Sequence, residues 1–190
     1  MKNLSLPEII QLIPGIERGN GVSLTPQGKK VRRKIYYVAA ITGSSDITPD
    51  GRLIEASTQK AIGRTNFDKG NLLNDGRSFL VTGIRMLFDT TADTTKLTAT
   101  YKNEAPAQFK NGELKISQEG SGDLFHNPIS GFVKNDLSLS EDQEFEAVVP
   151  FLIRPNVPFD IQTLLAGAAT AGQAVRLEMD GYEFVDANKA

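Results

Sequence analysis

The sequence predicts an all-β protein, a single jelly-roll antiparallel β-sandwich preceded by a short N-terminal helical arm. Two segments, Ser78–Phe88 and Phe145–Ile153, alternate apolar and polar residues over a long stretch, which is the pattern of half-buried strands. Other strand-like segments follow one another without amphipathic helices between them, which favours an antiparallel sandwich over a parallel α/β sheet. Their long, uneven connections favour a jelly roll over an immunoglobulin-like sandwich.

Composition places narrow limits on the chemistry. The 190 residues suit one domain, which we divide into an arm at 1–21 and a sandwich at 22–190. The chain has no cysteine and one histidine, so thiolate metal sites and cysteine nucleophiles are excluded and no cofactor is expected. With a net charge of −2, the protein as a whole is not an electrostatic nucleic-acid binder.

The N-terminal arm has the features of a short helix. Ser5 is a suitable N-cap, Pro7 is tolerated in the first turn, and Pro14-Gly15 is expected to end the helix. Its apolar side chains need a place to be buried, either on the chain's own sandwich or on a neighbouring subunit. We therefore expect an inter-subunit arm whose contact residues are Ile9, Ile10, Leu12 and Ile13.

From Val31 onward, branched and aromatic residues predict strands separated by polar turns. The small-residue stretch Leu164–Ala174 contains two glycines and is read as a loop. The expected loops are 43–51, 66–77, 89–95 and 118–128. The expected strands are Lys34–Thr42, Leu53–Ser57, Ser78–Phe88, Lys96–Tyr101, Glu113–Ser117, Ile129–Val133, Phe145–Ile153, Asp160–Leu164 and Ala174–Phe184.

Alternation also predicts which side chains share a face in the two long strands. In the first strand, one face should carry Leu80, Thr82, Ile84, Met86 and Phe88, and the other Phe79, Val81, Arg85 and Leu87. In the second strand, one face should carry Phe145, Ala147, Val149, Phe151 and Ile153.

One run of positive charge precedes the first expected strand, with five basic residues among six. It could contact an anionic partner, either nucleic acid or lipid headgroups. Alternatively, it is a solvated strand edge, on which basic residues discourage aggregation. In an extended chain these residues would fall on opposite faces, three on one side and two on the other. The first set is Lys30, Arg32 and Lys34, and the second is Lys29 and Arg33.

Other motifs favour turns over catalytic sites. Asp46–Gly51 partly fits a calcium loop, but Ser57 stands where that loop needs a glutamate, so a plain turn is expected. Gly120–Asp123 lacks the flanking pattern of a nucleophile elbow. His126 is alone and is expected in a loop. No enzymatic activity is therefore expected, although a hydrolase that uses two carboxylates stays a distant alternative.

In style, the chain resembles the coat proteins of small tailless icosahedral bacteriophages. The segments that carry the resemblance are Ser78–Asp89, Phe145–Phe159 and Ala174–Val185, in which a long strand, an apolar strand entering a proline loop and a late Gly-Tyr strand follow one another. The resemblance implies a structural capsid subunit, major or minor, located in the virion after assembly in the host cytoplasm. Its partners would be copies of itself and other capsid proteins, and it supplies no active-site residues.

The second interpretation of the same features is a receptor- or carbohydrate-binding β-sandwich module. Neither interpretation involves the membrane interior, because no segment reaches the roughly 18 apolar residues that a span requires. The first residues also lack the apolar core of a secretory signal peptide. We therefore expect a protein that is not an integral membrane protein.

Overall fold

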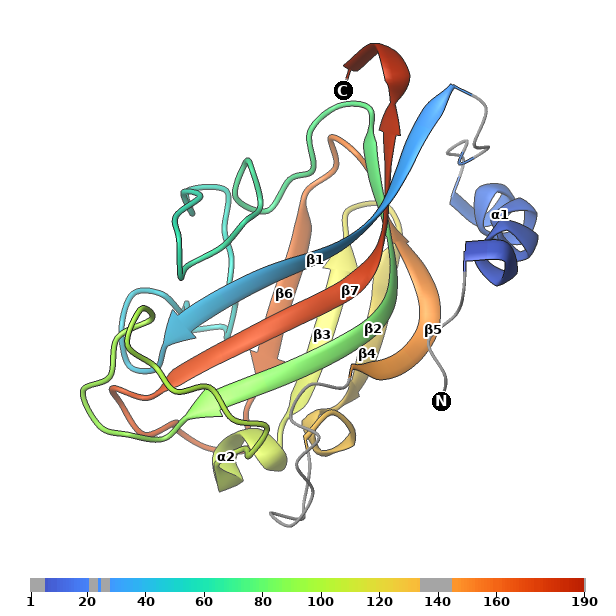
Figure 1. Ribbon diagram of the computed structural model, residues 1–190. Helices are drawn as coiled ribbons and strands as arrows, with labels where there is room; N and C mark the ends of the chain where they lie inside the picture. The colour runs from blue at the N-terminus through green and yellow to red at the C-terminus, as the bar shows by residue number, and fades with distance from the viewer. Residues whose placement is uncertain (1–5, 21–23, 25–27, 134–144, 190) are drawn as a thin grey trace.

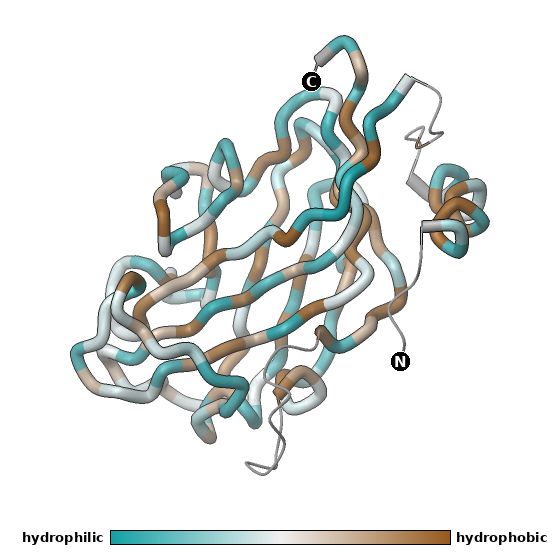
Figure 2. Tube along the Cα trace, in the orientation of Figure 1, coloured by the Kyte–Doolittle hydropathy of each residue, from teal (hydrophilic) through white to brown (hydrophobic). Residues whose placement is uncertain are grey.

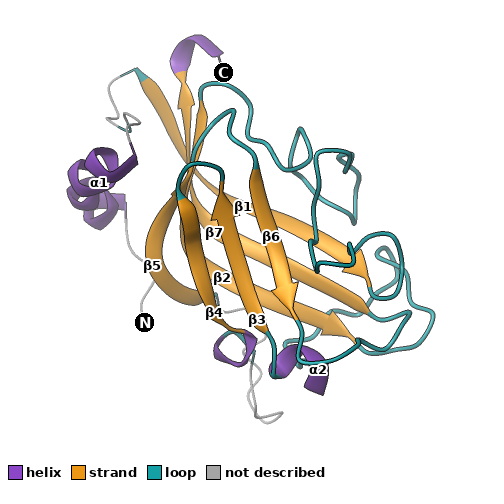
Figure 3. Ribbon diagram, turned by 180° about the vertical axis from the view of Figure 1, so that it is seen from behind, coloured by secondary structure: helices purple, strands orange, loops and turns teal. Residues whose placement is uncertain are grey.

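The computed structural model describes residues 6–20, 24, 28–133 and 145–189. It consists of two antiparallel sheets and a single N-terminal helix of more than one turn, which confirms the all-β prediction (Figures 1 and 3). The strand order is β1-β7-β2-β5 in one sheet and β4-β3-β6 in the other. The strands are β1 (Lys29–Ile41), β2 (Arg77–Asp89), β3 (Glu113–Gln118), β4 (Gly122–Pro128), β5 (Glu146–Ile153), β6 (Phe159–Leu164) and β7 (Ala174–Asp186). The helices are α1 (Leu6–Asn20), α2 (Ala107–Lys110), η1 (Ile129–Gly131) and η2 (Ala187–Lys189).

The core lies between the two sheets and is rich in aromatic rings. Tyr36 of β1 stacks on Phe67 with 4.5 Å between ring centroids, and it meets the edge of Phe79 at 4.8 Å. Phe67 in turn contacts Phe159 of β6 at 5.0 Å. Because Phe67 comes from the connection between β1 and β2, this predicted loop closes one end of the core instead of lying free on the surface.

The faces of β2 differ from the expected alternation because the strand contains a bulge. Its register with both neighbours shifts between Val81 and Gly83. A bulge changes the phase of a strand, so residues before and after it exchange faces. Phe79 and Val81 therefore share the core with Ile84, and Leu80 lies on the opposite face. The predicted grouping of Leu80 with Ile84, Met86 and Phe88 is wrong.

A larger irregularity changes the faces of β5. Between the pairs Val81–Phe151 and Gly83–Ala147, three residues of β5 lie opposite one residue of β2. Val148 packs against the core, whereas the side chain of Val149 is 87% exposed. The predicted face that joined Val149 to Phe151 and Ile153 is therefore wrong.

Helix α1 runs through Pro14 to Asn20, so the predicted end at Pro14-Gly15 is wrong. A proline inside a helix removes one hydrogen bond and costs about 3 kcal/mol. Packing of the following turn offsets this cost, because Ile16 continues the apolar stripe formed by Ile9 and Ile13. The stripe covers the outer face of the sheet at Leu80, Leu152 and Phe184. The predicted cap Ser5 lies outside the described residues.

Three expected strands do not form as regular strands. Leu53–Ser57 forms no strand, and only Arg52, directly before it, makes an isolated β-bridge, to Gln162. Lys96–Tyr101 folds into turns. Ile129–Val133 begins with the turn of η1. The strand before it, β4, occupies residues 122–128 of the segment 118–128 that was expected to be a loop. A segment with high β-propensity forms a strand only where a neighbouring strand is available to pair with it.

The free edge of β1 is covered in its second half by the connection to β2. The Asn66 side chain accepts a hydrogen bond from the Tyr37 backbone N–H at 2.8 Å and donates to the Ile35 carbonyl at 2.8 Å. Ala39 donates to the Arg64 carbonyl at 2.7 Å. These contacts take the place of a neighbouring strand. The first half of β1, which is hydrophilic in Figure 2, carries the basic run.

Candidate functional site

The basic run lies within β1 and not before it, since β1 begins at Lys29. The partners of these basic side chains show that they divide between two faces, as expected. Arg32 and Lys34 both reach Glu183 of β7, with nitrogen–oxygen distances of 2.5 and 3.0 Å. On the opposite face, Arg33 forms a bidentate ion pair with Asp180, with nitrogen–oxygen distances of 2.7 and 3.0 Å. The remaining two residues of the run are Lys29, paired with Asp186 at 2.9 Å, and Lys30, which is exposed.

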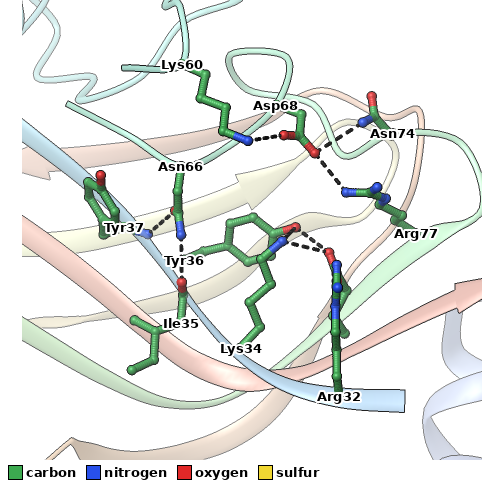
Figure 4. A network of polar contacts seen from close by, with 11 residues as sticks. Arg32, Lys34, Ile35, Tyr36, Tyr37, Lys60, Asn66, Asp68, Asn74 and Arg77 are labelled. Atoms are coloured by element: carbon green, nitrogen blue, oxygen red, sulfur yellow. Dashed lines mark hydrogen bonds and ion pairs between the residues drawn. The ribbon is translucent and has the colours of Figure 1, made fainter. Parts of the chain in front are cut away.

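Glu183 is the shared partner of Arg32, Lys34 and Tyr36, whose polar ends meet on the face of β1 that carries Tyr36 (Figure 4). Its side chain is 0% exposed, and it accepts hydrogen bonds from the Tyr36 hydroxyl at 2.5 Å and the Lys34 ammonium at 3.0 Å. Burial alone would raise the pKa of the Glu183 carboxyl, but the hydrogen bonds from Tyr36, Lys34 and Arg32 hold it below its ordinary value. Glu183 therefore stays ionised while buried.

The two donors that face Glu183 are also affected by burial. Burial lowers the pKa of the Lys34 ammonium, although the Glu183 carboxylate opposes this shift. Burial, followed by the hydrogen bond to Glu183, raises the pKa of the Tyr36 hydroxyl far above its ordinary value. Tyr36 thus remains a hydrogen-bond donor, and the ammonium of Lys34 lies 4.1 Å from the centre of its ring.

A second carboxylate lies beside this group, on the connection before β2 (Figure 4). Asp68 pairs with Lys60 at 2.6 Å and with Arg77 at 2.8 Å, and it accepts a hydrogen bond from the Asn74 amide at 3.2 Å. Burial would raise the pKa of Asp68, but Lys60, Arg77 and more distant Lys34 together lower it. The arrangement binds the loop to the end of the sheet.

Sequence reasoning identified the basic residues but missed their partners. Glu183 and Asp180 are more than 140 positions away from Arg32 and Arg33, and only the β1–β7 register brings them together. The available signal was that the C-terminal strand β7 carries four acidic residues, Asp180 and Glu183 among them. Neither Lys60 nor Asp68 gave any signal, because both stand in a polar connection.

The four arm residues separate into two pairs. Ile9 and Ile13 are buried on the chain's own sandwich, with exposed fractions of 0% and 4%. Ile10 and Leu12 face away from it and are 45% and 41% exposed. The contact with the chain's own sheet thus accounts for one half of the arm, and the other half presents apolar surface to the outside.

Two other sequence motifs, Asp46–Gly51 and His126, lie in a turn and in a strand. Asp46–Gly51 is a turn, as predicted, and the Asp46 carboxylate contacts Lys96 at 2.5 Å. His126 lies on β4 and not in a loop, with its Nε2 at 2.6 Å from a Glu113 oxygen. Pairing with β3 explains the difference, because Lys115 lies directly opposite His126.

Two open hollows lie away from the basic run. One, of about 500 Å³, is formed by loops and includes Asp46, Arg64, Lys96 and the exposed side chains of Ile62 and Leu97. The other, of about 560 Å³, opens between β4 and β5. Within the described residues, no group of three or more His, Asp or Glu side chains is arranged to hold a metal ion.

The described residues include no helix with the length and apolar character needed to cross a membrane. A scan against protein-family models and a search of curated proteins both found no match to this chain.

Proposed function

We propose that this chain is a structural subunit of an icosahedral viral shell, built as a single jelly roll and located in the virion. Its partners would be copies of itself and other capsid proteins. The proposed role is structural and not enzymatic. Assembly would take place in the host cytoplasm, and the proposal includes a weak contact between the basic face of β1 and an anionic partner.

The jelly-roll assignment is supported by the order in which strands pair. β1 pairs with β7, β2 with β5 and β3 with β4, and Arg52, between β1 and β2, bridges to Gln162 of β6. From the outermost pair inward, the order is β1–β7, Arg52–Gln162, β2–β5 and β3–β4. Each pair is nested within the one before it, as in one long antiparallel hairpin rolled into two sheets. Such rolling is the topology of a jelly roll.

The observation that carries the functional proposal is the divided arm. A fold alone does not determine function, because one sandwich topology serves many roles. One face of the arm packs on the chain's own sheet, and the other face exposes Ile10 and Leu12. This exposed apolar surface is available for a neighbouring subunit. Shell subunits need such surface for contact with one another, whereas on a monomeric protein it would promote aggregation.

The test is assembly of the purified chain, followed by sedimentation velocity and electron microscopy. The double variant Ile10→Asp with Leu12→Asp should raise the concentration required for assembly by about tenfold or more, which corresponds to about 1.4 kcal/mol. The matched control is Ile35→Asp with Leu164→Asp, because these side chains are 41% and 39% exposed. A wild-type chain that stays monomeric at high concentration would contradict the proposal.

The alternative function is a receptor- or carbohydrate-binding module, and the loop hollow favours it. Asp46 and Lys96 supply polar groups there, and Ile62 and Leu97 are 91% and 74% exposed. Concave sites with a few convergent polar groups are typical of ligand binding. A glycan screen on the monomeric chain would separate the alternatives, since binding that Lys96→Ala abolishes would favour the module.

A further inference from the structure

Cationic side chains from three parts of the chain gather on one face of the sheet, at the end where β1 begins. Lys30 of β1 and Arg77 of β2 lie opposite the same residue of β7, Val185. Side chains two and four positions after Lys30 point to the same face, since a strand alternates. A further lysine reaches in from the connection before β2 (Figure 4). This cation cluster consists of Lys30, Arg32, Lys34, Lys60 and Arg77.

The cluster carries an excess of positive charge although the whole chain is at −2. Among the described residues, the carboxylates in contact with the five cations are Glu183 and Asp68. Five cations and two carboxylates leave an excess of three positive charges. On the other face of β1, by contrast, Lys29 and Arg33 each have their own carboxylate. The positive excess is therefore confined to one face.

The cations are arranged in two tiers. Lys34 and Arg77 form the inner tier, with side chains 23% and 24% exposed and held by carboxylates. Arg32 and Lys60 form the outer tier at 56% and 55%, together with the exposed Lys30. Arg32 and Lys60 are oriented by ion pairs and still have N–H donors that their carboxylates do not use. Fixed cations with free donors are suited to phosphate oxygens.

We propose that the cation cluster binds the phosphate backbone of a nucleic acid strand, an inference that rests on the anionic partner in the proposed function. The contact reads the backbone and not the bases. Tyr36, the aromatic residue beneath the cluster, is 1% exposed and stacks on Phe67 in the core, so no base can stack on it. Binding is therefore independent of sequence and sensitive to salt.

The experiment measures the fluorescence anisotropy of a labelled oligothymidylate across a salt series. The test variant is Lys30→Gln with Lys60→Gln, because neither lysine contacts the buried Glu183. The control is Lys102→Gln with Lys110→Gln, which changes the net charge equally at exposed positions outside the cluster. The test variant should bind more weakly at low salt, and its slope of log affinity against log salt should fall by about 1.4, or 0.7 for each lost phosphate contact. The control should retain the wild-type slope.

Equal weakening by both double variants would overturn the proposal, because net charge alone would then explain binding. So would an unchanged slope in the test variant with an unchanged thermal unfolding midpoint. Co-sedimentation with phosphatidylcholine vesicles, with and without phosphatidylserine, forms the second arm. Binding that depends on the cluster with anionic vesicles, but not with the oligonucleotide, would overturn the nucleic-acid assignment. Since these assays use the unassembled chain, their outcome is independent of whether shells form.

Discussion

At the scale of single residues, Glu183 shows how a buried charge is kept in a sheet. Its carboxylate has lost contact with water, which is unfavourable unless hydrogen bonds replace that contact. Tyr36, Lys34 and Arg32 supply those hydrogen bonds, all from the same face of β1. Arg32 and Lys34 thus stabilise the β1–β7 pair through Glu183.

The first prediction concerns the effect of Glu183 on stability and its dependence on pH. Glu183→Gln should lower the free energy of unfolding at pH 7 by about 3 kcal/mol, because Lys34 and Arg32 lose their buried counter-charge. The folded state holds the pKa of Glu183 below its ordinary value of 4.5, so its contribution is complete above that pH and is lost as the pH falls through the folded-state pKa. The difference between wild type and variant should therefore shrink in acid.

Urea denaturation of both proteins between neutral and acidic pH measures this difference. Glu146→Gln is the control, since Glu146 is exposed at the start of β5 and its loss should change stability little. A difference between wild type and Glu183→Gln that is constant over the whole pH range would contradict the prediction, because it would show that folding does not lower the pKa of this carboxyl.

The sequence shows these residues unequally. Five basic residues in six are visible in the one-dimensional string, and alternation correctly predicted that Arg32 and Lys34 share a face. Glu183 could not be assigned to them, because Arg32 and Glu183 are 151 positions apart and the register of their strands depends on the whole sheet and not on either strand. Pairing across a sheet is the information that local patterns lack.

At the scale of elements, the bulge in β2 has a structural counterpart in β7. A Cβ atom at Gly181 would lie 2.0 Å from the Leu80 carbonyl oxygen, which is far inside van der Waals contact. Gly181 lies opposite Val81, where the register of β2 begins to shift. The close approach of the two backbones at this point therefore requires glycine.

The second prediction follows from this close approach. Gly181→Ala should lower the free energy of unfolding by about 1–3 kcal/mol or more, because the backbones of β2 and β7 must move apart. Gly167→Ala is the matched control, since a Cβ at Gly167 meets nothing within 4 Å. Thermal denaturation of the two variants tests the prediction, and equal midpoints would mean that the strands can accommodate the added methyl group.

Strand length and bulges together explain which predictions of elements were confirmed and which were wrong. The strands at 78–88, 145–153 and 174–184 were expected and are present as β2, β5 and β7, because each is long and strongly patterned. The faces of β2 and β5 were wrong, because simple alternation cannot show an inserted residue. Helix α1 extends past Pro14 for a tertiary reason, the packing of Ile16, which local breaker rules do not include.

At the scale of the whole molecule, apolar surface and positive charge lie in different places. The cation cluster is at the start of β1, whereas β4 and β5 form the neighbouring edges of the two sheets (Figures 1 and 3). The hollow between these edges includes Phe125, whose ring lies 5.4 Å from that of Phe132 and 5.7 Å from that of Phe151 between centroids. Pro150 lacks a backbone N–H, which limits hydrogen bonding along this edge. Contact there is expected through side chains and not through an extended sheet.

The last prediction therefore concerns Val149, which stands out from the bulge of β5 at the rim of that hollow. If the chain assembles as proposed, an 87% exposed valine beside a group of phenylalanine rings should be buried against a neighbouring subunit. Val149→Asp should leave the fold intact, since the side chain contributes little to the core, and should weaken assembly by about tenfold or more. Ile62→Asp, at a 91% exposed isoleucine in a loop, introduces the same charge as a control. Sedimentation velocity over a range of concentrations compares the two variants with wild type. Assembly of Val149→Asp at the wild-type concentration would place the contact surface elsewhere on the molecule, and the arm with Ile10 and Leu12 would then have to supply it.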